Sequence, residues 1–118
     1  MSRVDNMITD LLDTVLDQGA SHLYLFSGLT PRYCFNSKWT AEVEASEVLE
    51  TEELKDDFLS LEITVDEFGK GIYTHLPVEG DTEYVVFAVD VSDYKSAFEV
   101  TFKVKSRYED LTMGAVND

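Results

Sequence analysis

Few side chains in this sequence have the types and spacing that metal binding requires. The two histidines, His22 and His75, would need help from carboxylates, and neither has a second ligand at helical spacing. Acidic residues are abundant, but the Ca²⁺-binding pattern of acids at alternate positions around a central glycine is missing. We therefore expect no metal site and no cofactor.

Nucleophilic and phosphate-binding motifs are also missing. The single cysteine, Cys34, lies between two aromatic residues, which favours a buried, unreactive thiol over a nucleophile. A phosphate-binding loop needs a glycine-rich segment that ends in Lys followed by Ser or Thr. The one Gly-Lys pair, Gly69-Lys70, is followed by Gly71 instead. We expect no catalytic residue and infer that the protein is not an enzyme.

The composition indicates a folded and strongly acidic domain. The 118 residues include 24 acids and 9 bases, a formal net charge of −15, and 44% of them are apolar. Direct binding to nucleic acid or to an anionic membrane is disfavoured, because phosphate contacts need clustered Lys and Arg. No apolar run is long enough to span a membrane, and the N-terminus lacks a secretion signal. We expect a cytoplasmic protein whose partner has a basic surface.

The acids are concentrated in the middle of the chain. Between Glu42 and Glu67 there are eleven acids and one base, Lys55. Two interpretations remain open: a solvated helix face whose acids are favoured by the helix dipole, or an acidic docking surface. The single tryptophan either closes the core or anchors a partner. The predicted contact surface consists of Lys38, Trp39, Glu47, Glu50, Glu52, Glu53, Asp56 and Asp57.

Apolar spacing predicts two helices. In the first, residues 8, 11, 12, 15 and 16 form one apolar face, Asp5 is the expected N-cap, and Gly19 is expected to end the helix in the left-handed conformation. In the second, a narrow stripe of Leu54, Phe58 and Leu61 faces the core, and Thr51 is the expected cap.

The remaining segments predict strands. They cover residues 22–26, 33–35, 39–43, 72–76, 84–91 and 98–105, and a polar connection is expected at residues 92–96. The last strand alternates cleanly between apolar and polar residues, so its register is well specified. The sum is one α+β domain over residues 1–106, with an antiparallel sheet on which both helices pack, and a flexible tail over 107–118.

Three motifs follow one another near the start of the chain: the helix Ile-Thr-Asp-Leu-Leu from Ile8, the run Gln-Gly-Ala-Ser-His-Leu-Tyr-Leu from Gln18, and the turn Gly-Leu-Thr-Pro ending at Pro31. With these motifs the first part of the chain resembles the N-terminal domain of type IV pilus retraction and type II secretion ATPases. The likeness continues more weakly to residue 105. The family's Asp and His in this strand are His22 and Tyr24 here, and its Arg in the next strand is Cys34.

The resemblance implies a PAS-like fold and a role in contacts between subunits of a ring. The Walker motifs of the motor are absent, and we expect the chain to stop where the ATPase domain of such a motor would begin, so the resemblance does not imply ATP hydrolysis. The favoured function is a stand-alone, non-enzymatic module that binds and modulates a motor ATPase or another protein complex. The alternative is an acidic nucleic-acid mimic, of phage or mobile-element origin, that inhibits a host defence such as CRISPR by occupying a basic groove. A small-molecule sensor is a weaker third hypothesis, and homo-oligomerisation stays open.

Overall fold

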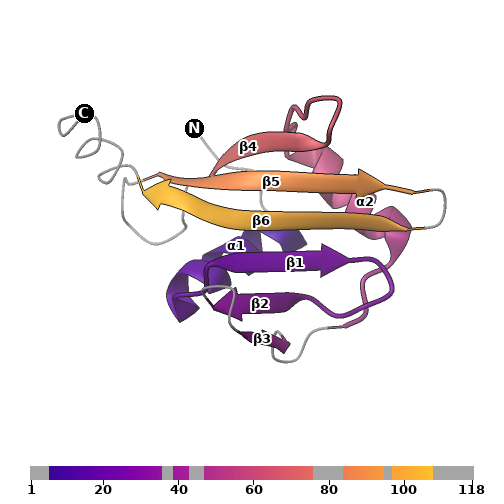
Figure 1. Cartoon of the computed structure of the whole chain (residues 1–118). Helices are drawn as coiled ribbons and strands as arrows, with labels where there is room; N and C mark the ends of the chain where they lie inside the picture. Colours follow the sequence, from indigo (N-terminus) through magenta and orange to yellow (C-terminus); the bar gives the residue numbers. More distant parts are fainter. Residues whose placement is uncertain (1–5, 36–38, 43–46, 76–83, 95–96, 108–118) are drawn as a thin grey trace.

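A computed structural model describes residues 6–35, 39–42, 47–75, 84–94 and 97–107. Helices α1 (Met7–Gln18) and α2 (Thr51–Ser60) are combined with six strands. These are β1 (His22–Phe26), β2 (Arg32–Phe35), β3 (Trp39–Glu42), β4 (Lys70–His75), β5 (Val85–Asp93) and β6 (Phe98–Arg107). The strands form one sheet in the order β3-β2-β1-β6-β5-β4, in which all neighbours are antiparallel (Figure 1).

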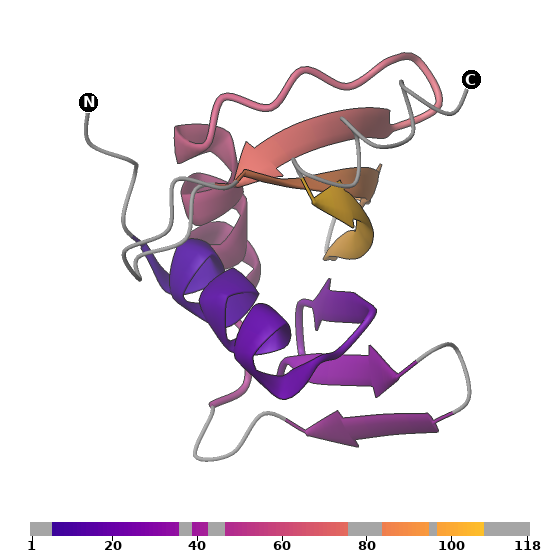
Figure 2. The same ribbon diagram turned by 90° about the vertical axis from the view of Figure 1, so that its left-hand side faces the viewer.

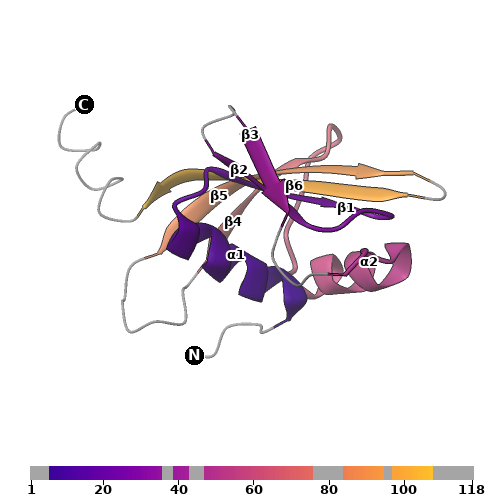
Figure 3. The ribbon, with the colours of Figure 1, turned by 90° about the horizontal axis from the view of Figure 1, so that it is seen from below.

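Both helices pack on the same face of the sheet, and among the described residues no helix lies on the other face (Figures 2 and 3). The alternation of the strands produces this arrangement. Leu23, Leu25, Val100 and Phe102 point to the helices and are fully buried, whereas the residues between them point away. The expected α+β class, with two helices on one antiparallel sheet, is confirmed.

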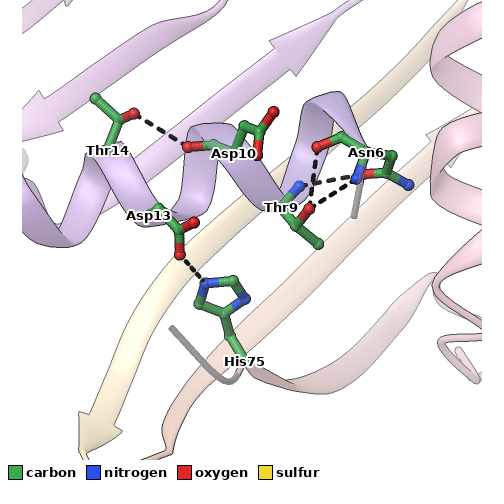
Figure 4. A network of polar contacts seen from close by, with 6 residues as sticks. All are labelled: Asn6, Thr9, Asp10, Asp13, Thr14 and His75. Carbon is green, nitrogen blue, oxygen red and sulfur yellow. Dashed lines mark hydrogen bonds and ion pairs between the residues drawn. The ribbon is translucent and has the colours of Figure 1, made fainter. Parts of the chain in front are cut away.

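The N-terminal helix begins one residue later than expected. Asn6, not Asp5, is the N-cap, and its side chain accepts hydrogen bonds from the backbone N–H groups of Ile8 and Thr9. The Thr9 hydroxyl in turn accepts from the Asn6 backbone N–H, which completes a capping box (Figure 4). Asp5 itself lies outside the described residues. The expected left-handed C-cap at Gly19 is confirmed, with φ of 73°.

Two further boundaries differ from the sequence prediction. At the start of α2 the cap position belongs to Glu50, which makes no side-chain capping bond, and Thr51 is already the first helical residue. Strand β5 continues through Ser92 and Asp93, which were expected in a connection, because these residues pair with Glu99 and Phe98 of β6. Polar residues occur there because antiparallel pairing needs only backbone groups, and the end of the strand is exposed.

The last strand shows the predicted alternation, with Phe98, Val100 and Phe102 buried. It runs to Arg107, one residue into the predicted tail, and residues 108–118 lie outside the described part of the chain. The sequence also predicts a bend at Asn36 and Ser37 and a turn at residues 79–81, and these positions lie outside the described part of the chain as well. Among the residues that the structure describes, no helix is long and apolar enough to cross a membrane.

Candidate docking surface

The acidic residues predicted to contact a partner are carried mainly by α2. One side of this helix is in the core, where Leu54 is fully buried and the rings of Phe58 and Phe98 lie 5.6 Å apart. The other side carries the acids, of which Glu52, Glu53 and Asp56 are exposed and Asp57 is half-buried. The amphipathic stripe therefore fixes which side of α2 faces solvent.

Side-chain contacts near its middle and its C-terminal end hold α2 in place. The Asn6 side-chain amide donates to the Asp57 carbonyl oxygen at 3.0 Å and to the Ser60 hydroxyl at 2.8 Å. The Lys55 ammonium lies 3.2 Å from an Asp93 carboxylate oxygen and 5.7 Å from the centre of the Phe98 ring. The one base of the acidic segment is thus committed to an internal ion pair with the end of β5. The acids on the outer side of α2 therefore have no basic neighbour from their own segment.

The distribution of acids along α2 separates the two interpretations of the acidic segment. Glu52 and Glu53 lie in the first turn, where the helix dipole favours negative charge. Asp56 lies in the middle of the helix and Asp57 at the start of its last turn, where the dipole no longer favours negative charge, and the last turn contains no base. Burial, and secondarily the charge of Asp56, raise the pKa of Asp57 above its ordinary value. Helix stability thus accounts for the first pair of acids and not for the second.

Glu47 and Glu50 extend this acidic surface on the segment that leads into α2. Both are exposed, while Leu49 between them is buried. Leu49 is fixed to the turn after β1, since its carbonyl accepts from Gly28 at 2.8 Å and its N–H donates to Leu29 at 2.9 Å. The segment therefore follows a defined path that keeps both glutamates in solvent.

Of the other two predicted contact residues, Lys38 lies outside the described residues, and only the backbone of Trp39 is described. Trp39 begins β3, the outermost strand on one side of the sheet, whereas α2 lies behind the opposite half, near β4 to β6 (Figure 1). We define the acidic surface from here on as Glu47, Glu50, Glu52, Glu53, Asp56 and Asp57.

His75 has a structural role that the sequence did not reveal. Its side chain is fully buried, and Nε2 lies 2.8 Å from a carboxylate oxygen of Asp13, which ties β4 to α1 (Figure 4). The two residues are 62 positions apart, so no local pattern could have joined them. Within the described ranges, no group of three or more His, Cys, Asp or Glu residues is placed to hold a metal ion.

The remaining candidates for chemistry lie on the helix-free face of the sheet. Cys34 is buried, as expected, and pairs across the strands with His22. Burial, and then the nearby charge of Lys103, lower the pKa of His22, while burial followed by a hydrogen bond to Cys34 raises the pKa of Tyr24. Both shifts favour the neutral forms of these side chains, as in a packed cluster.

Comparisons with known proteins give a match in structure only. No family model and no curated protein matches the sequence. Solved structures do match the fold, among them the X-ray structure of the ATPase DotB from Legionella pneumophila, with a TM-score of 0.57 and 14% sequence identity. The match covers 88% of this chain and 30% of the DotB chain, so this chain spans less than a third of that protein's length. The described domain therefore shares its fold with one part of the DotB ATPase structure.

Proposed function

We propose that the chain is a non-enzymatic protein-interaction module, related to the N-terminal domain of pilus and secretion motors, that docks on a motor ATPase. The acidic surface binds a basic patch on that ATPase. The observation that carries this proposal is that the acids of α2 continue beyond its first turn to Asp56 and Asp57, where the dipole no longer favours negative charge and where burial raises the pKa of Asp57. Acids that the helix itself does not favour are consistent with selection for contact with a partner.

The shared fold supports the choice of partner. This chain matches part of an ATPase structure over most of its own length. The family resemblance implies that this kind of domain makes contacts between the subunits of a ring, and a free copy would occupy such a contact. Such a module would modulate assembly of the ring without any catalytic group of its own. Neither part of the proposal needs a metal, a cofactor or a nucleophile in this chain.

The test is a binding measurement against a purified pilus-retraction or secretion ATPase encoded in the same genome, by biolayer interferometry. The double variant Glu52→Gln/Asp56→Asn removes two charges from the acidic surface. The matched control Asp10→Asn/Asp17→Asn removes two charges from exposed positions of α1. We expect the α2 variant to weaken binding by about tenfold or more, and the control to change it by less than about twofold.

Two results would contradict the proposal. One is absence of binding between the wild-type chain and the ATPase, and the other is an equal loss in both double variants, which would indicate a net-charge effect without a defined surface. Competition provides a further discrimination. If single-stranded or duplex DNA displaces the chain from its target, the target site is a nucleic-acid groove, and the mimic hypothesis replaces this one.

A further inference from the structure

The hairpin between α2 and β4 presents apolar side chains to solvent. Phe68, at its tip, is 74% exposed, and Ile72 and Val65 on its two arms are 57% and 36% exposed. In the described part of the chain, eight large hydrophobic residues are exposed, and three of them fall within these eight positions. Single exposed apolar residues are ordinary, but a concentration in one hairpin is characteristic of a contact site.

Hydrogen bonds inside the turn fix its conformation. One carboxylate oxygen of Asp66 accepts from the backbone N–H of Phe68 at 2.8 Å and from that of Lys70 at 2.9 Å. The Asp66 N–H donates to the Lys70 carbonyl at 2.8 Å, and Gly69 N–H donates to the Asp66 carbonyl at 3.0 Å. The backbone on both sides of Phe68 is therefore held by side-chain and main-chain bonds together.

The turn is also fixed to the body of the sheet. Gly69 has a φ of +78° and accepts a hydrogen bond of 2.8 Å from the Val91 N–H. A Cβ at Gly69 would lie 2.2 Å from the Val91 carbonyl oxygen, so the turn packs directly on β5. Lys70 adds an ion pair with Asp90 of β5. Figures 2 and 3 show this connection reaching the side of the sheet that the helices leave open.

We propose that Phe68 is an anchor residue that inserts into an apolar pocket of a protein partner whose rim carries Lys or Arg. A rigid turn suits this role, because the loop loses little conformational freedom on binding and an aromatic ring buries a large area. The rim of the partner is basic because the neighbours of Phe68 are acidic. Glu62, Asp66 and Glu67 are all exposed around the hairpin.

The same charges decide between the occupants that an apolar patch could have. A second copy of this chain would bring the same acids against each other at a net charge of −15 per copy. A phosphate-bearing lipid or nucleic acid would be repelled for the same reason. A basic-rimmed protein satisfies both the ring and the acids. This inference rests on the proposed function as an interaction module, and it adds a contact separate from the acidic surface.

The probe is the full-length chain with the photoreactive analogue p-benzoylphenylalanine in place of Phe68, expressed in the organism that encodes it. A second chain carries the analogue in place of Tyr94, which is 56% exposed directly after β5, at the end of that strand where Val91 contacts the hairpin. It therefore tests whether capture is specific to position 68 or general to exposed rings at this end of the sheet. We expect a protein cross-linked from position 68 and not from position 94. That protein is then purified and its binding measured against wild type, Phe68→Ala and Tyr94→Ala.

The proposal predicts that Phe68→Ala weakens binding by about tenfold or more while Tyr94→Ala leaves it unchanged. Unfolding midpoints of both variants should equal that of wild type, since neither ring is buried. The proposal is overturned if position 68 gives no cross-link or if both positions give equal cross-links. It is also overturned if the cross-link joins a second copy or the chain's own terminus, or if Phe68→Ala leaves binding unchanged.

The outcomes also separate this inference from the proposed function. If the captured partner depends on Phe68 and is not a motor ATPase, the anchor stands and the motor proposal fails. If the ATPase binds through the acidic surface and Phe68→Ala has no effect, the motor proposal stands and the anchor fails.

Discussion

Gly69 and Gly19 have nearly the same backbone conformation in different surroundings, which allows the cost of a left-handed residue to be separated from the cost of a close approach. Their φ angles are +78° and +73°. A Cβ at Gly19 would meet no heavy atom within 4 Å, whereas a Cβ at Gly69 would lie 2.2 Å from the Val91 carbonyl oxygen. The comparison of Gly69→Ala with Gly19→Ala is therefore a matched test of the packing of the hairpin on β5.

The expected magnitudes follow from these surroundings. An alanine in the left-handed region costs about 1–2 kcal/mol, of which the stiffer unfolded chain returns about 0.4–1 kcal/mol. We expect Gly19→Ala to lower the free energy of unfolding by about 1 kcal/mol. Gly69→Ala should add about 1–3 kcal/mol for overpacking and about 1 kcal/mol for the displaced hydrogen bond from the Val91 N–H, for a total of about 3 kcal/mol or more.

The assay is urea unfolding of wild type and both variants, followed by circular dichroism, with the free energy of unfolding extrapolated to water. A domain of this size should be stable enough, at about 5–15 kcal/mol, for the weaker variant to remain folded without urea. If the two alanine variants lose the same free energy within about 0.5 kcal/mol, the hairpin does not pack on Val91 as described. The rigidity on which the Phe68 anchor depends would then be refuted as well.

Three further predictions concern the helices and the buried histidine. Asp13→Ala should lower the free energy of unfolding by about 1–3 kcal/mol, because it removes the carboxylate that lies 2.8 Å from the buried His75 Nε2. Asp13→Asn should cost less because it keeps an acceptor oxygen, and urea unfolding measures both variants. Asp57→Asn should raise the unfolding midpoint at pH 7, because the raised pKa means that ionised Asp57 destabilises the folded state above that pKa. The gain should disappear as the pH falls through that pKa, and a gain that stays constant in thermal unfolding between pH 3 and pH 7 would show that the pKa of Asp57 is not raised. Glu62 has a φ of 55°, where glycine is favoured. Glu62→Gly should therefore raise the free energy of unfolding by about 0.5–1 kcal/mol more than Glu62→Ala, which removes the same charge. An equal effect of the two variants in urea unfolding would show that only the charge of Glu62, and not its backbone conformation, destabilises the fold.

Local patterns were sufficient for the elements and the fold class. The stripe of Leu54, Phe58 and Leu61 predicted α2 and its buried side, and the alternation from Phe98 predicted the register of β6, since a shift by one residue would expose that apolar set. The errors lie at element ends, where several polar residues can serve equally well. Asn6 caps α1 in place of Asp5 because it also binds α2 through Asp57 and Ser60, a contact that sequence spacing does not contain.

The sequence by itself determined an acidic α+β domain without a recognisable catalytic motif, because charge, periodicity and motif spacing are properties of the linear chain. Tertiary structure alone decided which charges remain available to a partner. Lys55 is drawn into an ion pair with Asp93, and His75 meets Asp13 across 62 positions. Phe68 is the strongest case: its sequence neighbours suggest only a polar turn, and its role as a rigid exposed ring depends on Gly69 packing against Val91 of a distant strand. Contacts between segments far apart in the chain depend on how the sheet is assembled, and no local pattern records them.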